Sequence, residues 1–95
     1  MPAYALTAGK IKPGQMDAAR EFGRSVNDRL LKLPGIIGWG WAETGESEIM
    51  LIAVYKDAGS AEGAAPVVQG FFADLVPMLA APPQRQVVPG EWFTP

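Results

Sequence analysis

The sequence predicts an α+β fold in which a four-stranded antiparallel sheet carries two helices on one face, in the order βαββαβ. Two observations support this prediction. Four short apolar segments and two segments with helical periodicity follow one another in that order along the 95 residues. In addition, 48% of the residues are hydrophobic and 19% are charged, which is more apolar material than one small core needs. We therefore expect a single domain over residues 1–95 that also forms an interface.

The first strand is predicted over Ala3–Ile11, because this apolar segment ends at a Lys-Pro-Gly turn signal. The long helix that follows is predicted from one apolar stripe with spacings of three and four residues. The stripe consists of Met16, Ala19, Phe22, Gly23, Val26, Leu30 and Leu33. Arg24, Asp28 and Lys32 lie four residues apart, so we expect ion pairs between them on the exposed side.

A hairpin is predicted next, with strands over Ile36–Ala42 and Ile49–Tyr55 joined by a glutamate-rich turn. A sheet with one wet face alternates apolar and polar residues, and these two strands contain no charged side chain. Regular alternation places Ile37, Trp39 and Trp41 on one face of the first strand and Ile36, Gly38, Gly40 and Ala42 on the other. Both sets are apolar, so we expect both faces of the sheet to be dry.

The second half of the chain is predicted to contain a short helical turn, a second long helix and the last strand. Asp57 or Ser60 is suited to cap the short turn. The helix is predicted over Pro66–Leu79, with a proline disturbing its last turn. Its inward-facing residues are Val68, Phe71, Phe72, Leu75 and Leu79. The last strand is predicted over Gln84–Trp92, and its internal Pro89-Gly90 indicates an edge position or a bulge.

The two predicted helices cover only one face of the sheet, because right-handed crossovers place them on the same side. The other face is also apolar, and exposing it would leave a larger patch than soluble monomers normally tolerate. The sequence therefore predicts a homodimer in which two copies pack sheet against sheet.

Charge and hydropathy argue against several other partners. The formal charge of −2 includes no run of like charges, so no nucleic-acid partner is expected. No segment approaches the roughly 18 consecutive apolar residues of a membrane span, so no membrane partner is expected. The first residues lack the pattern of a secretion signal, and we therefore expect a cytoplasmic protein.

Three segments resemble the dimeric α/β-barrel superfamily, whose members are ferredoxin-like. They are Lys12-Pro13-Gly14-Gln15, the long helix, and the run Leu-Pro-Gly-Ile-Ile-Gly-Trp at residues 33–39. The antibiotic-biosynthesis monooxygenase-like domains are the branch that the chain resembles most. In that branch an aromatic residue follows the helix-ending Pro-Gly, here Trp39, and the third strand ends in an aromatic, here Tyr55. The resemblance spans nearly the whole chain and implies a dimer whose two sheets form a barrel around a pocket.

Five residues are candidates for a ligand-binding site: Tyr4, Trp39, Trp41, Tyr55 and Arg85. The two tryptophans either wall an aromatic pocket or fill the core or the dimer interface. The tyrosine hydroxyls either orient a ligand or lie at the surface. Arg85 is either an anion anchor or an ordinary exposed strand charge. We expect solvent around the remaining polar candidates, which are Asn27 and the glutamates of the hairpin turn, and an edge or interface position for Trp92.

The sequence contains no histidine and no cysteine, which removes the commonest general base, the commonest haem ligand and any thiol nucleophile. Haem-degrading members of the superfamily use an Asn, Trp and His set, so haem degradation is not expected here. No metal-ligand spacing or phosphate loop is present, and Gly38-Trp39-Gly40-Trp41 lacks the third glycine of a dinucleotide fingerprint. We expect no cofactor and no metal, and the catalytic residues, if there are any, stay unassigned.

Two functions remain open at this point. The first is a dimer that binds a small apolar or aromatic ligand, or that is purely structural. The second is cofactor-independent oxygenation of a phenolic or quinol substrate, for which a carboxylate, tyrosine or lysine would have to act as the base.

Overall fold

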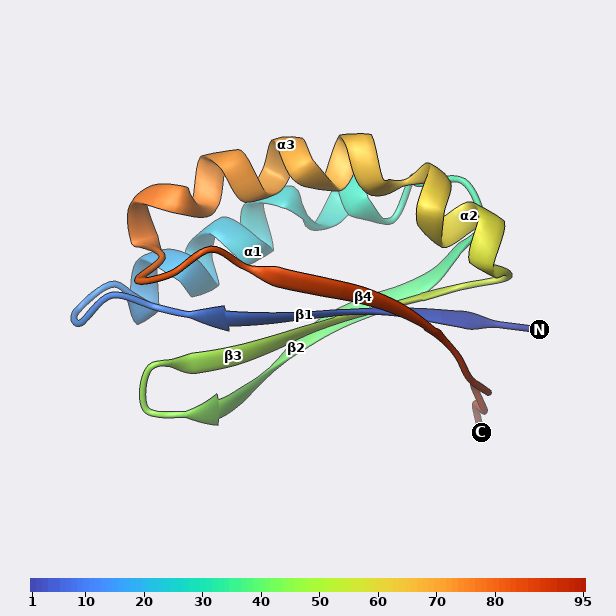
Figure 1. Cartoon of the computed structure of the whole chain (residues 1–95), viewed down its shortest axis with the longest axis horizontal. Helices are drawn as coiled ribbons and strands as arrows, with labels where there is room; N and C mark the ends of the chain where they lie inside the picture. The colour runs from blue at the N-terminus through green and yellow to red at the C-terminus, as the bar shows by residue number, and fades with distance from the viewer.

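The computed structural model describes all 95 residues and contains the predicted order of elements (Figure 1). The strands are β1 (Ala3–Lys10), β2 (Ile36–Gly45), β3 (Glu48–Tyr55) and β4 (Gln84–Pro89), and the helices are α1 (Met16–Leu30), α2 (Ala58–Gly63) and α3 (Ala65–Leu75), with a 3-10 turn, η1, over Val76–Met78. The sheet is antiparallel in the order β2-β3-β1-β4, and all helices lie on one of its faces. The fold is therefore the ferredoxin-like α+β fold that the sequence predicts.

The apolar faces of both long helices are as predicted, because helical periodicity needs only local information. All seven residues of the α1 stripe, and Val68, Phe71, Phe72 and Leu75 of α3, line the space between the helices and the sheet. The ends differ from the prediction by a few residues. α3 ends at Leu75, and the chain continues as η1, which contains Pro77.

The expected ion pairs between Arg24, Asp28 and Lys32 are wrong. Arg24 pairs instead with Glu21, one turn earlier, at 2.8 Å, and neither Asp28 nor Lys32 forms a salt bridge. A spacing of three residues brings helix side chains together as effectively as a spacing of four, so the sequence alone did not decide between the two partners.

A bulge in β2 corrects the predicted faces of this strand. The register between β2 and β3 shifts between Ile36 and Gly38, which leaves Ile37 as an extra residue with an exposed side chain. Ile36 therefore faces the helices together with Trp39, whereas Gly38 faces away from them. The regular alternation expected from the sequence fails at this one position.

The second half of the chain follows the prediction until its last strand. The carboxylate of Asp57 caps α2 by accepting the Ser60 N–H at 2.7 Å. β4 ends at Pro89 and does not extend to Trp92, because proline has no N–H for the ladder. The Gly90 N–H instead donates to a carbonyl at the start of the chain, at 3.1 Å.

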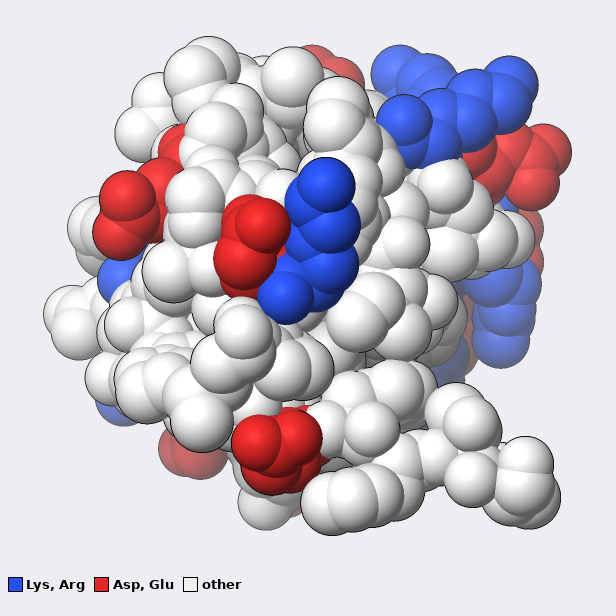
Figure 2. All heavy atoms as spheres, turned by 90° about the vertical axis from the view of Figure 1, so that its right-hand side faces the viewer, with Lys and Arg blue, Asp and Glu red and all other residues white.

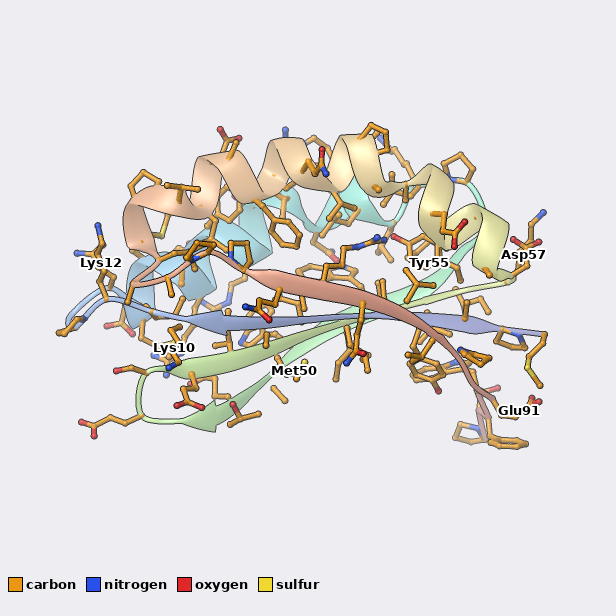
Figure 3. All side chains as sticks on the ribbon, in the orientation of Figure 1. Lys10, Lys12, Met50, Tyr55, Asp57 and Glu91 are labelled. Carbon is orange, nitrogen blue, oxygen red and sulfur yellow. The ribbon has the colours of Figure 1, made fainter.

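The core lies between the sheet and the helices in two clusters. One consists of Ala3, Ala5, Leu33, Tyr55, Ala61 and Ala64, and the other of Ile11, Ile49, Leu75 and Leu79. Tyr55 lies on the helix side of the sheet, whereas Met50, from the same strand, projects from the opposite face (Figure 3). None of the helices is long and apolar enough to cross a membrane.

The opposite face of the sheet, which we call the open face, is covered by no helix (Figure 1). The register assigns it Tyr4, Leu6, Ala8, Lys10, Gly38, Gly40, Ala42, Glu48, Met50, Ile52, Val54, Gln84, Gln86 and Val88. The only charged residues of this set are Lys10 and Glu48, which lie opposite each other at one end of the sheet. The tail after β4, in which Glu91 is the only charged side chain, lies at one end of the molecule, where charged side chains of both signs are scattered (Figure 2). Within the tail, Phe93 is 85% exposed.

Candidate ligand-binding site

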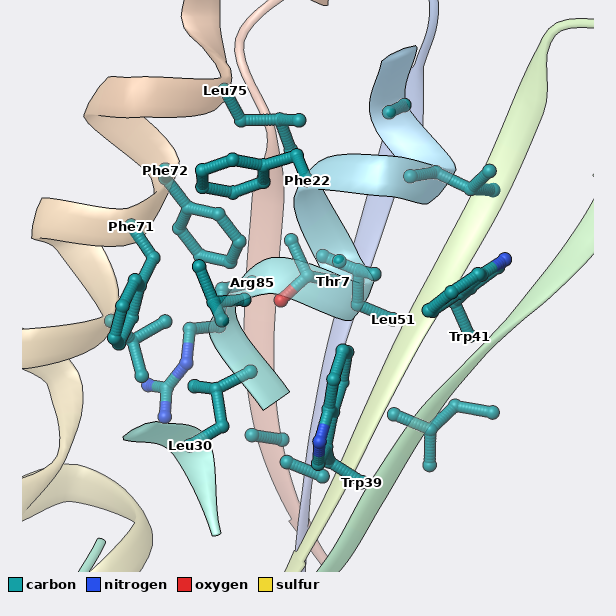
Figure 4. Close-up of a pocket in the computed structure, with 18 of the residues that line it drawn as sticks. Thr7, Phe22, Leu30, Trp39, Trp41, Leu51, Phe71, Phe72, Leu75 and Arg85 are labelled. Carbon is teal, nitrogen blue, oxygen red and sulfur yellow. The ribbon is translucent and has the colours of Figure 1, made fainter. Parts of the chain in front are cut away.

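A cavity of about 90 Å³ lies between α1, α3 and the helix side of the sheet (Figure 4). Nineteen of its 23 lining residues are hydrophobic, so its interior is almost entirely apolar. The helices contribute Phe22, Phe71 and Phe72, and β2 contributes Trp39 and Trp41. Apolar walls with a few polar groups are the usual composition of a small-molecule site.

Thr7 brings a hydroxyl into this apolar wall. Strand alternation directs Ala3, Ala5 and Thr7 toward the helices, and Thr7 lies between Leu51 of β3 and Arg85 of β4 in the register. Its side chain is 3% exposed, and its oxygen points into the cavity (Figure 4). The hydroxyl takes part in none of the side-chain hydrogen bonds of the protein.

Arg85 enters the cavity wall from β4. One of its terminal nitrogens donates to the carbonyl of Ala61 at 2.8 Å, which ties β4 to α2. The guanidinium forms no salt bridge, and no aspartate or glutamate lines the cavity. The other arginine of the wall, Arg20, lies at the rim, where its charge is balanced by Asp17 and Glu43. Arg85 is therefore the one unbalanced charge of the cavity wall.

Tyr55, at the end of β3, is 1% exposed and also lines the cavity. Burial raises the pKa of its hydroxyl, and the nearby positive charge of Arg85 opposes that effect in part. The raised pKa keeps the phenol neutral at neutral pH, so Tyr55 offers a hydrogen-bond donor and not a base.

The two indole rings of β2 close the cavity on the side of α1. Trp39 Nε1 donates to Asn27 Oδ1 of α1 at 2.8 Å, so the expectation that Asn27 faces only solvent is wrong. Trp41 Nε1 donates to Glu43 Oε2 at 3.3 Å. Each ring is therefore held by a side-chain hydrogen bond.

Glu43 is fixed in turn by Arg20, which reaches across from α1. Arg20 Nε and one terminal nitrogen donate to the two carboxylate oxygens of Glu43 at 2.9 and 2.6 Å. The hydrogen bonds from Arg20, and then that from Trp41, lower the pKa of Glu43 to about 2. The expectation that water alone surrounds the glutamates of this hairpin is therefore wrong for Glu43.

Gly23 of α1 lies against the ring of Trp41. A Cβ at this position would be 2.9 Å from Trp41 Cζ3, closer than ordinary van der Waals contact. A groove on the outside of the molecule is lined by Gly23, Asn27 and both rings, so the two tryptophans separate this groove from the cavity. The line between α1 and β2 is the side on which the cavity approaches the surface.

The structure thus brings four of the five predicted site residues together, namely Trp39, Trp41, Tyr55 and Arg85. Tyr4 lies on the open face, where its hydroxyl donates to the Glu91 carbonyl and its ring contacts Trp92 edge-on at 6.4 Å. The cavity lies inside one copy, between helices and sheet, whereas the pocket that the resemblance implied would lie between the sheets of two copies.

Sequence reasoning missed two polar residues of the site, Thr7 and Asn27. Thr7 had a visible signal, since it follows Ala3 and Ala5 at a spacing of two and is the only polar residue of the three. Asn27 had none, because its partner Trp39 is distant in sequence.

Together, this fold and this cavity define a ferredoxin-like α+β protein with a small aromatic site between its helices and its sheet. No family model and no curated protein matches the sequence. Solved structures do match, at low sequence identity, and they define the fold more closely.

A proposed antibiotic biosynthesis monooxygenase from Nitrosomonas europaea superposes with a TM-score of 0.82 at 14% identity, over 99% of this chain and 94% of its own. A conserved protein from Methanosarcina mazei Go1 gives a TM-score of 0.83 at 16% identity, over 96% and 94% of the two chains. A variant of SnoaB, a cofactor-independent oxygenase from Streptomyces nogalater, gives 0.77 at 10% identity, over 99% and 97%. The resemblance in the sequence is therefore confirmed at the level of the fold.

Proposed function

We propose that this protein binds a small aromatic ligand in the cavity between its helices and its sheet. The observation that carries the proposal is the composition of that cavity, in which aromatic walls surround a few hydrogen-bonding groups. Offset and edge-on contacts with phenylalanine and tryptophan rings favour a flat, apolar ligand. Thr7, Tyr55 and Arg85 lie where they can fix its orientation.

The size of the cavity limits the ligand to about one ring. An engineered core cavity of roughly 150 Å³ binds benzene, and the cavity here measures about 90 Å³. Even a single ring therefore requires some side-chain movement, and a polycyclic ligand would require α1 and β2 to separate. Side-chain hydrogen bonds connect these elements, from Trp39 to Asn27 and from Arg20 to Glu43.

A cofactor-independent oxygenase, the description given to SnoaB, is the second candidate function. It needs a group that removes a proton from the substrate near neutral pH. The titratable residues of the cavity wall are Arg20, Arg85 and Tyr55, and the pKa of Tyr55 is raised. The chain thus supplies no base inside the cavity, and the binding function is the better supported of the two.

The proposal also includes a homodimer through the open face. That face carries charges only at the end that holds Lys10 and Glu48, and the structure leaves it without cover from its own helices. Leu6, Met50 and Ile52 project from it, and a methyl group added at Gly38 or Gly40 would meet nothing within 4 Å. Flat glycine-containing strands allow a second sheet to approach closely.

The indole N–H signals of the three tryptophans provide a direct test of ligand binding. In 1H–15N spectra, titration with benzyl alcohol or benzoate should shift the signals of Trp39 and Trp41 and leave that of Trp92 unchanged. Ala53→Leu, which adds volume to the cavity wall, should weaken binding, whereas Ala73→Leu on the exposed side of α3 should not. Shifts confined to Trp92, or equal binding by both variants, would contradict the proposed site.

A further inference from the structure

We propose that the ligand of this cavity is an anion, a single-ring aromatic carboxylate, and that Arg85 anchors its negative charge. This inference rests on the proposed binding function and assigns the chemical class of its ligand. It follows from the charges and the hydrogen-bonding groups of the cavity wall.

The first observation is that Arg85 differs from the other arginines in its partners and its burial. Arg20 is balanced by Asp17 and Glu43, Arg24 is balanced by Glu21, and Arg29, which also has no carboxylate partner, is exposed to water. Arg85 has no carboxylate partner, although its side chain is partly buried against an apolar wall that contains no acidic residue. A charge withdrawn from water without a counterion is costly, and a bound anion would remove that cost.

The second observation is that Arg85 still has donors to offer. A guanidinium carries five N–H groups, and this one donates to the Ala61 carbonyl and lies beside the Tyr55 hydroxyl, which leaves further donors free. That bond holds the side chain in place at the cavity wall. The planar donor group is thereby oriented before any ligand arrives, which is the arrangement that suits a carboxylate.

The third observation is the hydroxyl of Thr7, directly opposite Arg85 in the register. The residue is 3% exposed, its hydroxyl forms none of the side-chain hydrogen bonds of the protein, and its oxygen is directed into the cavity (Figure 4). Tyr55 adds a second hydroxyl, which its raised pKa keeps protonated. The polar groups of the wall are thus donors, and the ligand that satisfies them must be rich in acceptors. A carboxylate is such a ligand, with two oxygens and about four lone-pair sites.

The competing interpretation is that Arg85 serves only to tie β4 to the end of α2 through Ala61. This interpretation accounts for one donor and leaves the hydroxyl of Thr7 without a role. The two interpretations differ in what they predict for ligands of equal shape and different charge.

Benzoate and benzyl alcohol form a matched pair for the test, because both carry one ring and differ in charge. Titrations of the wild-type protein at pH 7 should give a dissociation constant for benzoate about tenfold or more below that for benzyl alcohol. The preference should weaken as salt is added, since part of it is electrostatic. This comparison needs no variant and therefore does not depend on the folding of one.

Arg85→Met should remove the preference for benzoate while it retains binding of benzyl alcohol. Arg29→Met is the control, because Arg29 lies outside the cavity, 4.9 Å from the centre of the Phe71 ring, and should keep the full preference. Thr7→Val, which replaces the hydroxyl with a methyl group, should reduce benzoate affinity severalfold with little effect on benzyl alcohol.

The outcomes separate this inference from the proposed function. Equal affinity of the wild-type protein for both ligands would be consistent with a binding site for neutral ligands and would contradict the proposal that the ligand is an anion. Loss of the preference in Arg29→Met as well as in Arg85→Met would overturn the role of Arg85. Absence of binding by either ligand would remove the proposed function and this inference together.

Discussion

The two faces of the sheet are both apolar, yet they are built differently. The helix-facing side carries bulky rings, with Trp39 and Trp41 held by hydrogen bonds to Asn27 and Glu43. The open face carries glycines and flexible aliphatic chains, and none of its residues is tied to a side chain of another element except through the tail. Hydropathy alone does not separate a face that encloses a cavity from a face that no helix covers. Side-chain volume and polar anchoring do.

Neighbouring residues of β3 provide the strongest test of this difference, because Met50 and Leu51 project from opposite faces. Leu51→Lys should abolish cooperative unfolding, since an unpaired charge inside the cavity costs about 3–5 kcal/mol and would lie near Arg85. Met50→Lys should keep the fold and abolish the proposed dimer. Circular dichroism and sedimentation velocity measure the two effects.

Met50→Leu is the control for the second variant, because it keeps the open face apolar and should leave the assembly unchanged. If Met50→Lys sediments as the wild-type protein does, the open face is not the interface between copies. If Leu51→Lys unfolds cooperatively at the wild-type midpoint, the helix-facing side is not the dry layer described here.

The hydrogen bond between Asn27 and Trp39 provides a second test. Asn27→Ala should lower the free energy of unfolding by about 1–2 kcal/mol, because it leaves the half-buried indole N–H without its partner. The adjacent Asp28→Ala should change it by less than about 0.5 kcal/mol, because Asp28 is exposed and forms no salt bridge. Urea unfolding of both variants measures the difference, and equal midpoints would mean that this bond does not hold the ring.

Two glycines in helices, one exposed and one packed against Trp41, test whether the ring of Trp41 is held in place. Gly70→Ala on the exposed side of α3 should stabilise the protein by about 0.5–1 kcal/mol, because the new methyl group meets nothing within 4 Å. Gly23→Ala should lack this gain, because its methyl group would press on the Trp41 ring. Thermal unfolding compares them. An equal gain in both variants would show that the Trp41 ring moves aside freely.

Acid provides the smallest expected effect. Because the pKa of Glu43 is lowered from 4.5 to about 2 in the folded protein, its contribution to stability is present above pH 4.5 and is lost as the pH falls toward 2. The urea midpoint of the wild-type protein should therefore fall more between pH 6 and pH 3 than that of Glu43→Gln. Glu43 is largely solvated, so the difference should be small. Identical pH profiles of the two proteins would mean that the contacts of Glu43 do not contribute to stability.

The sequence predicted the features that depend on local periodicity. The predicted inward-facing stripes of α1 and α3 were correct, because the spacing of apolar residues along a helix is enough to assign each one to a face. The faces of β2 were partly wrong, because a bulge at Ile37 shifts the alternation and has no local signature in an apolar strand. The strand order itself followed from general rules of connection.

The aromatic and charged residues of the candidate site could be predicted from the sequence, but the hydrogen-bond partners of these residues could not. Trp39, Trp41 and Arg85 stand out as residue types. The pairing of Asn27 with Trp39, and of Arg20 with Glu43, joins positions far apart in the chain. Such pairs depend on how α1 lies over β2, which is decided by packing of the whole molecule.

The closeness of the two indole rings has an optical consequence. Trp39 and Trp41 lie 5.8 Å apart between ring centres and are tilted by 41°. At this separation their electronic transitions couple, and the sign and amplitude of the resulting circular dichroism depend on the mutual angle of the rings. The proposed ligand, if it entered between α1 and β2, would change that angle. The two rings are therefore an unlabelled chromophore pair whose circular dichroism would report the separation of α1 and β2.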